Sequence, residues 1–409
     1  MWKTCLFYLK ALFLGGGCLL AGVCLCAAQT YDAGAGSSQH ELRLRHRRYA
    51  RGQEGGNLWS AYSAWLKEAQ TKFNIQAGVD ISYALQRVSS SGKQTAVQGI
   101  YYPFVQWNVL SGGSWGKGVI NANYTLVHYW GTEAFQLQRR IGAAAGINDG
   151  LTGSESFSQL TYTHTLPGKW DWLSLTAGQF SIGNFDSTSY LGNQQTSLMN
   201  ASFAQDLSSV YPSSSVGAYG QASYGGWSLS AGYQDASNLS GQDIRLDQAF
   251  SGKYAFFTAL SLTEKNGGFY NFLYYHQPSV RGQEESSNGF SLSLQQPLAD
   301  KWVVFARGNY SGGDVAAVSR SFAAGAGLKD PFGLNAQDII LLGVAFNRLN
   351  PSAWGNHLSQ KRESVFELQW VWNITPWISL SPDVQLYPKT AQKGRRFAAA
   401  AGLRTTIML

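Results

Sequence analysis

One short stretch of the sequence has the spacing of a catalytic motif. Residues 112–116 read Gly-Gly-Ser-Trp-Gly, which fits the G-x-S-x-G pattern around a nucleophilic serine, here Ser114. Such a serine must sit on a sharp turn between a strand and a helix. Residues 117–130 instead alternate as a strand does, so the sequence argues against hydrolysis at this position.

Metal-ligating residues form no pattern in this chain. The six histidines have no ligand spacing, and all four cysteines lie within the first 26 residues. We therefore expect no metal ion and no cofactor, and we predict that the protein is not an enzyme.

A larger group of polar side chains has the spacing of one strand face. Residues two apart in a strand point to the same side. Carboxylate, amide and guanidinium groups placed together can bind solute hydroxyl groups without creating a large net charge. The alternative is that each residue is ordinary polarity facing water. The candidates from this pattern are Glu367, Gln369, Asp383, Gln385, Arg396 and Arg404.

These candidates belong to a chain that alternates from Asn74 to its last residue. In residues 364–388, Phe366, Leu368 and other large apolar residues alternate with polar ones, and similar segments recur along the chain. Tight turns, such as Gly225-Gly226, alternate with longer connections rich in Ser, Gly, Asp and Asn. About 20 to 24 residues per strand and turn predict about 16 antiparallel strands.

The N-terminus indicates export. Residues 1–28 have a basic start, an apolar run and small residues before a cleavage site, which is typical of a signal peptide; a membrane anchor is the alternative. Residues 29–56 are polar, basic around 43–51, and predicted to be disordered. We expect this basic segment to touch anionic lipid or peptidoglycan, and we expect no nucleic-acid partner. Residues 57–73 have the spacing of a short helix.

The apolar strand faces raise the question of what they contact. No stretch after residue 28 has 18 uninterrupted apolar residues, so no spanning helix is predicted. An exported chain with this many amphipathic strands closes most simply as a barrel whose apolar face contacts lipid. We therefore predict an all-β transmembrane barrel in the outer membrane, formed by residues 74–409 after the short N-terminal helix. A soluble β-sandwich or propeller is the alternative.

Several segments resemble a known family, the carbohydrate-selective porins of the OprB type. The resemblance rests on "LSLTAGQFSIGNFD", on "YPSSSVGAYGQASYGGW", on "WVVFARGNYSGGD" and on "ESVFELQWVWNITPWISLSPDVQLYP". It is good from Phe157 onward and weak from Tyr83 to Ala145. It implies a trimeric outer-membrane porin of a Gram-negative cell that lets mono- or oligosaccharides diffuse passively. It also adds Arg307, which matches the family's Phe-x-Arg strand, to the candidates.

The polar composition fits neutral solutes. From Asn57 onward the chain has 24 basic and 21 acidic residues, because seven of its 31 basic and three of its 24 acidic residues come earlier. This balance predicts weak ion selectivity. A general diffusion porin, a barrel that exports a polysaccharide and a barrel enzyme are the alternatives.

One long connection is a candidate for narrowing the pore. Residues 181–215 lie between two predicted strands and either fold into the lumen or form a plain external loop. The residues of interest in this connection are Phe185, Asp186, Tyr190, Asn193, Gln194 and Gln195.

Overall fold

A computed structural model describes residues 57–409 of the chain, except 90, 91, 93, 248, 251 and 393–396. The predicted signal peptide (1–28), the basic segment (29–56) and Arg396 therefore lie outside the described residues. The described part begins with helix α3 (Asn57–Phe73), where the sequence predicts a short helix.

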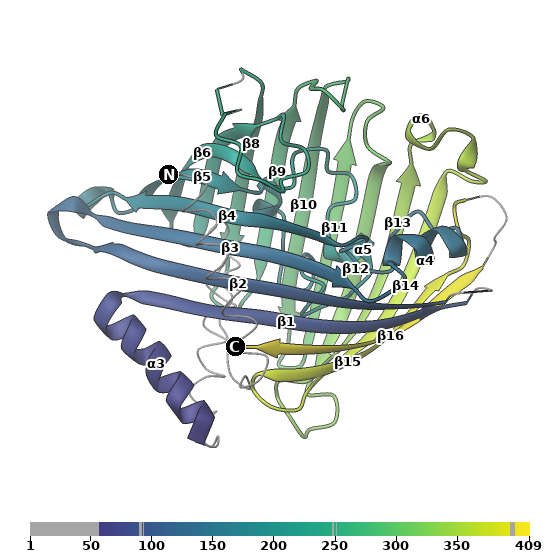
Figure 1. Ribbon diagram of the computed structural model, residues 1–409, viewed down its shortest axis with the longest axis horizontal. Helices are drawn as coiled ribbons and strands as arrows, with labels where there is room; N and C mark the ends of the chain where they lie inside the picture. The colour runs from purple at the N-terminus through teal and green to yellow at the C-terminus, as the bar shows by residue number, and fades with distance from the viewer. Residues whose placement is uncertain (1–56, 90–91, 93, 248, 251, 393–396) are drawn as a thin grey trace.

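Sixteen antiparallel strands form one closed barrel, which confirms the predicted fold (Figure 1). Each strand pairs with its neighbours in the chain, and the first strand pairs with the last, so the sheet has no open edge. The strands are β1 (Ile75–Val88), β2 (Thr95–Ser111), β3 (Lys117–Tyr129), β4 (Ser154–Thr165), β5 (Leu173–Phe180), β6 (Ser215–Tyr224), β7 (Trp227–Asp235), β8 (Tyr254–Thr263), β9 (Phe269–Gln277), β10 (Ser287–Leu298), β11 (Trp302–Ser311), β12 (Val318–Lys329), β13 (Ile339–Leu349), β14 (Arg362–Asn373), β15 (Ile378–Tyr387) and β16 (Ala398–Met408).

Short helical segments interrupt the connections. The α-helices after α3 are α4 (Ala134–Ile141), α5 (Ala201–Ala204) and α6 (Pro351–Trp354). The 3-10 helices are η1 (Gly113–Trp115), η2 (Gly168–Trp170), η3 (Ile182–Phe185) and η4 (Gly355–His357). Within the described part of the chain, every helix is too short or too polar to cross a membrane.

Side chains alternate across the barrel wall as the sequence predicts. On β14, the outward Leu368 is 51% exposed, whereas the inward Glu367 and Gln369 are 1% and 0% exposed. The same contrast holds on β7, where Trp227 and Leu229 are exposed and Ser228 and Ser230 are buried. The apolar side chains therefore face outward, where a bilayer would cover them.

The two ends of the barrel differ in their connections. One end has tight turns, such as Gly225-Gly226, where both glycines have positive φ. The opposite end has the long connections, including 130–153, 181–214 and 236–253. Nine of the 14 tryptophans lie at the tight-turn end: Trp107, Trp115, Trp170, Trp172, Trp227, Trp302, Trp370, Trp372 and Trp377. Tryptophan is typical of a membrane–water interface, so this end has a well-formed aromatic girdle.

The lumen is partly filled by two hydrophobic clusters. The first joins Leu137 and Ile141 of α4 and Phe203 of α5 to inward residues of the wall such as Phe305 and Leu341. Helix α5 lies beside β12 and β13, as Figure 1 shows, and α4 contacts β2. These inward apolar residues depart from the predicted polar lumen face, because folded-in connections cover them.

The second cluster lies against β6 to β9. It joins Ile182 and Phe185 of η3 to Tyr219, Phe257 and Tyr275 of the wall. Phe185 packs against Phe257 with ring centroids 4.6 Å apart. Val210 near the end of the connection 181–214 belongs to this same cluster, whereas Leu198 and Phe203 in its middle belong to the first cluster. The connection therefore leaves one part of the wall, contacts another and returns.

Candidate pore constriction

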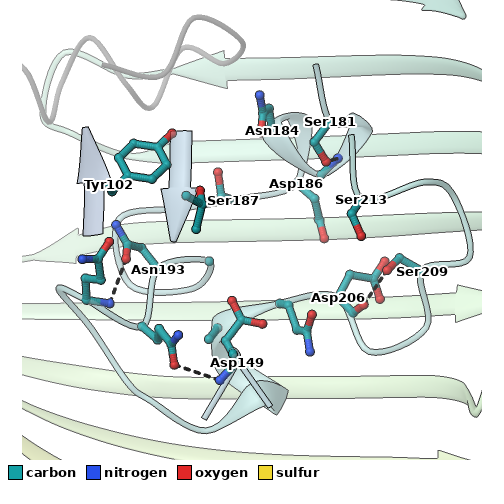
Figure 2. Close-up of a pocket in the computed structure, with 18 of the residues that line it drawn as sticks. Tyr102, Asp149, Ser181, Asn184, Asp186, Ser187, Asn193, Asp206, Ser209 and Ser213 are labelled. Atoms are coloured by element: carbon teal, nitrogen blue, oxygen red, sulfur yellow. Dashed lines mark hydrogen bonds between the residues drawn. The ribbon is translucent and has the colours of Figure 1, made fainter. Parts of the chain in front are cut away.

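A polar cavity of about 470 Å³ remains beside the folded-in connection. Figure 2 shows side chains from the 181–214 connection, from residue 149 and from the wall around this space. Its uncharged polar lining consists of Tyr102, Thr125, Ser181, Asn184, Ser187, Thr188, Asn193, Gln194, Gln195, Gln205, Ser209, Tyr211 and Ser213. Its charged lining consists of Asp149, Asp186, Asp206 and Arg307. The connection 181–214 thus folds inward, and the alternative of a plain external loop is wrong.

The walls of the cavity come from separate elements. Tyr102 on β2 and Thr125 on β3 line the side opposite the connection. Asp149 belongs to the connection between β3 and β4, and its backbone N–H donates to the Gln194 side chain at 2.9 Å. The two long connections therefore support one another inside the barrel.

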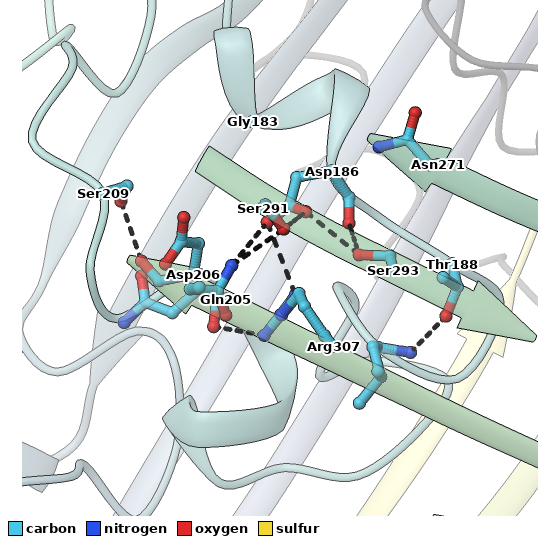
Figure 3. A network of polar contacts seen from close by, with 12 residues as sticks. Gly183, Asp186, Thr188, Gln205, Asp206, Ser209, Asn271, Ser291, Ser293 and Arg307 are labelled. Atoms are coloured by element: carbon cyan, nitrogen blue, oxygen red, sulfur yellow. Dashed lines mark hydrogen bonds and ion pairs between the residues drawn. The ribbon is translucent and has the colours of Figure 1, made fainter. Parts of the chain in front are cut away.

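Arg307 holds the connection near α5. Its guanidinium Nη2 donates to the carbonyl oxygens of Ser202 (3.4 Å), Phe203 (3.3 Å) and Gln205. Its Nη1 lies 3.9 Å from a carboxylate oxygen of Asp186 (Figure 3). Because the guanidinium is 1% exposed, removing it would leave buried acceptors and a buried carboxylate uncompensated, at a cost of about 3–5 kcal/mol.

Asp186 joins η3 to strands β10 and β11. Its carboxylate accepts hydrogen bonds from Ser291 Oγ, from Ser293 Oγ at 3.1 Å and from Asn309 Nδ2 at 3.5 Å (Figure 3). Burial raises the pKa of Asp186, although Arg307 and these donors favour its charged form. Asp186 is therefore one of the anchors that fix the constriction, besides being part of its lining.

Asp206 is a titratable group of the lining near neutral pH. Burial, and next the charge of Asp186, raise the pKa of Asp206 to about 7, while Arg307 opposes the shift. One carboxylate oxygen accepts from the backbone N–H of Ser208 at 2.7 Å, and the other has no protein partner among the described residues. The lining therefore gains negative charge as the pH rises through 7.

Five of the predicted site residues lie on the inner wall but under the connection. Glu367 accepts from the backbone N–H groups of Met199 (2.5 Å) and Asn200 (3.0 Å). Arg404 Nη1 donates to the carbonyl oxygens of Gln194 and Ser197, the latter at 2.6 Å. These two side chains bind the backbone of residues 194–200, which we call the tethered segment.

The other three have different surroundings. Gln385 accepts from Asn200 Nδ2 at 2.9 Å and donates to the Ile147 carbonyl at 2.8 Å. Asp383 accepts from Gln385 Nε2 at 3.1 Å. Gln369 is 0% exposed, and neither of its side-chain polar atoms has a hydrogen-bond partner in the described part of the chain. All three point inward as predicted, but the tethered segment and its neighbours separate them from the cavity.

Of the strand residues predicted to contact solutes, Arg307 alone lines the cavity among those with a described position. Four of the residues singled out in the 181–215 connection also line it, namely Asp186, Asn193, Gln194 and Gln195. The structure adds Asp149 and Asp206, which strand periodicity cannot identify because they lie in connections. Glu363 does not line the cavity but is a further anchor of the connections, because its carboxylate accepts from the backbone N–H groups of Ala144, Ala145 and Ala391. The sequence contains a signal for Glu363, because it lies four positions before Glu367 on the same strand and therefore faces inward too.

The catalytic reading of Ser114 has no support in the structure. Ser114 lies in η1, within the tight connection between β2 and β3, and β3 follows directly. The strand–turn–helix arrangement of a nucleophile elbow is therefore missing at this position. The described residues also contain no group of three or more His, Cys, Asp or Glu side chains that could hold a metal ion.

Comparisons with known proteins agree on one family. Residues 245–409 match the family described as carbohydrate-selective porin, OprB family. Porin AaxA of Chlamydia abortus is 33% identical over 317 residues, which cover 76% of this chain and 70% of that protein. Porin AaxA of Chlamydia caviae is 29% identical over 360 residues, covering 85% and 79%.

A solved structure has a similar fold. The high-pH structure of Pseudomonas putida OprB superposes with a TM-score of 0.69 at 14% identity and covers 85% of this chain and 97% of that one. At such low identity the likeness concerns the fold alone.

Proposed function

The chain belongs to the OprB family of carbohydrate-selective porins, and we propose that small neutral sugars diffuse passively through its constriction. Fold and family make it a porin of the outer membrane, that is, a channel. The observation that carries the finer proposal is the cavity lining, in which hydroxyl and amide side chains outnumber charged ones. Such groups can replace the hydrogen bonds that a sugar makes with water, without binding it tightly.

The geometry also suggests how solutes are sorted by size. The tethered segment and part of the first cluster fill the lumen on the side of β12 to β16, and the second cluster lies against β6 to β9, so the open path lies toward β2 and β3. Because Arg307 and Asp186 are buried and hydrogen-bonded, the lining is preorganised rather than formed around each solute. A fixed constriction favours monosaccharides over disaccharides.

A second candidate function is the passage of small cations. Three aspartates and a single arginine line the cavity, and that arginine is already bonded to backbone carbonyls. Ionised carboxylates attract cations and repel anions in a narrow pore. The lining is therefore expected to disfavour anions, whichever of the two solute classes it passes best.

Liposome swelling tests the proposal. Vesicles containing the purified porin are exposed to neutral mono- and disaccharides and to cationic and anionic solutes of equal size. We expect fast entry of monosaccharides, slower entry of disaccharides and the slowest entry of anions. Faster entry of cations than of neutral sugars would favour the second candidate, and faster entry of anions would contradict both.

The remaining features of the function are predictions. Export through a cleaved signal peptide is checked by N-terminal sequencing of the mature protein. A homotrimer, which the family resemblance implies, is checked by light scattering of the detergent-solubilised barrel. General diffusion without sugar preference predicts equal entry of sugars and other neutral solutes of the same size, and polysaccharide export predicts no preference for small solutes.

A further inference from the structure

Three arginines form a single row on the outer surface of the barrel. Arg320 on β12 pairs with Arg348 on β13, and Arg348 pairs with Arg362 on β14. All three side chains are exposed, and the residues that alternate with them, including Asn347 and Glu363, are buried in the lumen. We call these three residues the arginine row.

Such a row is unfavourable without a partner. Side chains directly opposite on neighbouring strands are about 5 Å apart at Cβ, and like charges at this spacing destabilise the sheet. Among the described residues, Arg348 and Arg362 have no side-chain ion pair or hydrogen bond, and Arg320 lies 5.3 Å above the Tyr310 ring. The nearest carboxylate in sequence, Glu363, faces inward and accepts from three backbone N–H groups. The charges of the row are thus free to meet an external anion.

An apolar groove begins beside the row and extends along the outer wall. It has a volume of about 620 Å³, and Arg320 and Tyr310 form part of its lining. Its floor contains Ala306 and Gly308 of β11, between Leu292 of β10 and Phe322 of β12. Gly308 pairs with both Leu292 and Phe322, so the missing side chain opens the space between these two bulky residues.

The row lies one apolar band away from the tryptophan girdle. Trp302 begins β11 at the tight-turn end, and Tyr310, which pairs with Arg320, is eight residues further along the same strand. Eight residues at about 3.4 Å each span about 27 Å along the strand, or about 20 Å along the normal at a tilt of about 40°. This nearly matches an apolar band of about 25 Å. The row therefore lies at the interface on the long-connection side, which in an outer-membrane barrel faces outward.

We propose that the arginine row and the groove bind one phosphorylated lipid of the outer leaflet, with its phosphates on the arginines and an acyl chain in the groove. Guanidinium groups bind phosphate oxygens in bidentate pairs, which are among the strongest hydrogen bonds in proteins. The groove is continuous with the lipid-facing surface, so an acyl chain reaches it without leaving the bilayer. Bound phosphate also removes the repulsion within the row.

A second copy of the chain is a weaker candidate for this surface. The outward faces of β12 to β14 expose nothing acidic in the described residues, so a twofold contact of this surface with itself would bring arginine against arginine. A phosphorylated lipid instead supplies both the negative charge and the apolar chain that the two features require.

Native mass spectrometry of the full-length barrel in detergent tests the proposal. The protein is titrated with bisphosphorylated lipid A, with its dephosphorylated form and with inorganic phosphate. We expect the bisphosphorylated lipid to bind about tenfold or more tightly than the dephosphorylated one. Inorganic phosphate should bind weakly, because it has no chain for the groove.

Three variants separate charge from shape. R320Q/R348Q/R362Q removes the charges and should abolish the preference for the phosphorylated lipid. R320K/R348K/R362K keeps the charges and should bind it more tightly than the glutamine variant. Gly308→Leu fills the groove, since a Cβ there meets its nearest neighbour, a Phe322 ring carbon, only at 4.0 Å. It should weaken binding of both lipids and leave phosphate binding unchanged.

Two controls keep the result interpretable. Arg87→Gln removes another outward arginine near the long-connection end, and it should not change lipid binding. Heat-modifiable mobility and single-channel conductance should match the unmodified protein in every variant, because these residues lie outside the lumen. The proposal would be overturned if both lipids bound equally, or if the glutamine variant bound the phosphorylated lipid as tightly as the unmodified protein. It would also be overturned if the lipid-free protein were an oligomer and the glutamine variant were not, because the row would then be a contact between copies of the chain.

Discussion

The inner wall of the barrel has two sides with the same alternation and different roles. On the side of β14 to β16, Glu367 and Arg404 form hydrogen bonds with the backbone of the tethered segment. On the side of β2 and β3, Tyr102 and Thr125 face the cavity. An ionisable inward residue can therefore hold a connection in the lumen rather than contact a solute.

The largest expected effect comes from breaking the tether. Glu367→Ala leaves the buried N–H groups of Met199 and Asn200 without their acceptor, at a cost of about 3 kcal/mol. The population with a detached segment should then rise by roughly 100-fold. Single-channel recordings should show frequent transitions to a larger conductance and poorer discrimination between mono- and disaccharides.

A conservative variant distinguishes loss of the tether from misfolding of the whole barrel. Glu367→Gln keeps one acceptor oxygen and should lie between the alanine variant and the unmodified protein. If both variants fold, as judged by heat-modifiable mobility, and both conduct like the unmodified barrel, Glu367 is not a tether.

An intermediate effect is expected on the cavity side, from Asp206. Its pKa of about 7 means that the group is mostly protonated at pH 6 and mostly ionised at pH 8. Preference for cations over anions should therefore increase from pH 6 to pH 8, and Asp206→Asn should flatten that increase. Reversal potentials in a salt gradient measure this preference. If the preference depended on pH as steeply in the variant, another group would be responsible for the pH dependence.

The smallest effect is expected from Gln369, which sits two residues from Glu367 on the same inner face. Neither of its side-chain polar atoms has a hydrogen-bond partner among the described residues, so Gln369→Leu removes no bond and leaves no partner unsatisfied. We expect unchanged conductance and an equal or higher unfolding temperature in detergent. A marked loss of stability would show that the amide has a partner, such as a buried water.

These contrasts also show what the sequence could predict. The positions of Leu368 and Gln369 on opposite faces follow from a period of two, and sixteen strands follow from the spacing of the turns. The inward direction of Glu367 follows in the same way. Its partners do not, because Met199 and Asn200 are 168 and 167 residues away in the chain.

The lining of the cavity could be predicted only in part from the sequence. The 181–215 connection was a candidate for narrowing the pore because of its length and polar content, and Asp186 was within it. Asp149 and Asp206 had no such signal, since connections have no fixed period and their place depends on packing against distant strands. The inward position of the apolar residue Phe305 could not be predicted either, because the strand pattern does not show that α5 and Tyr190 cover it.

Solutes are expected to pass through the cavity beside the connection and not along the wall beneath it. Cysteine modification tests this directly, because every natural cysteine lies in residues 1–26. A bulky water-soluble thiol reagent should label Ser187→Cys, which lines the cavity, and should reduce both conductance and sugar entry. The same reagent should leave Gln369→Cys unlabelled and its conductance unchanged. Rapid block through Gln369→Cys with none through Ser187→Cys would show that solutes pass along the wall instead.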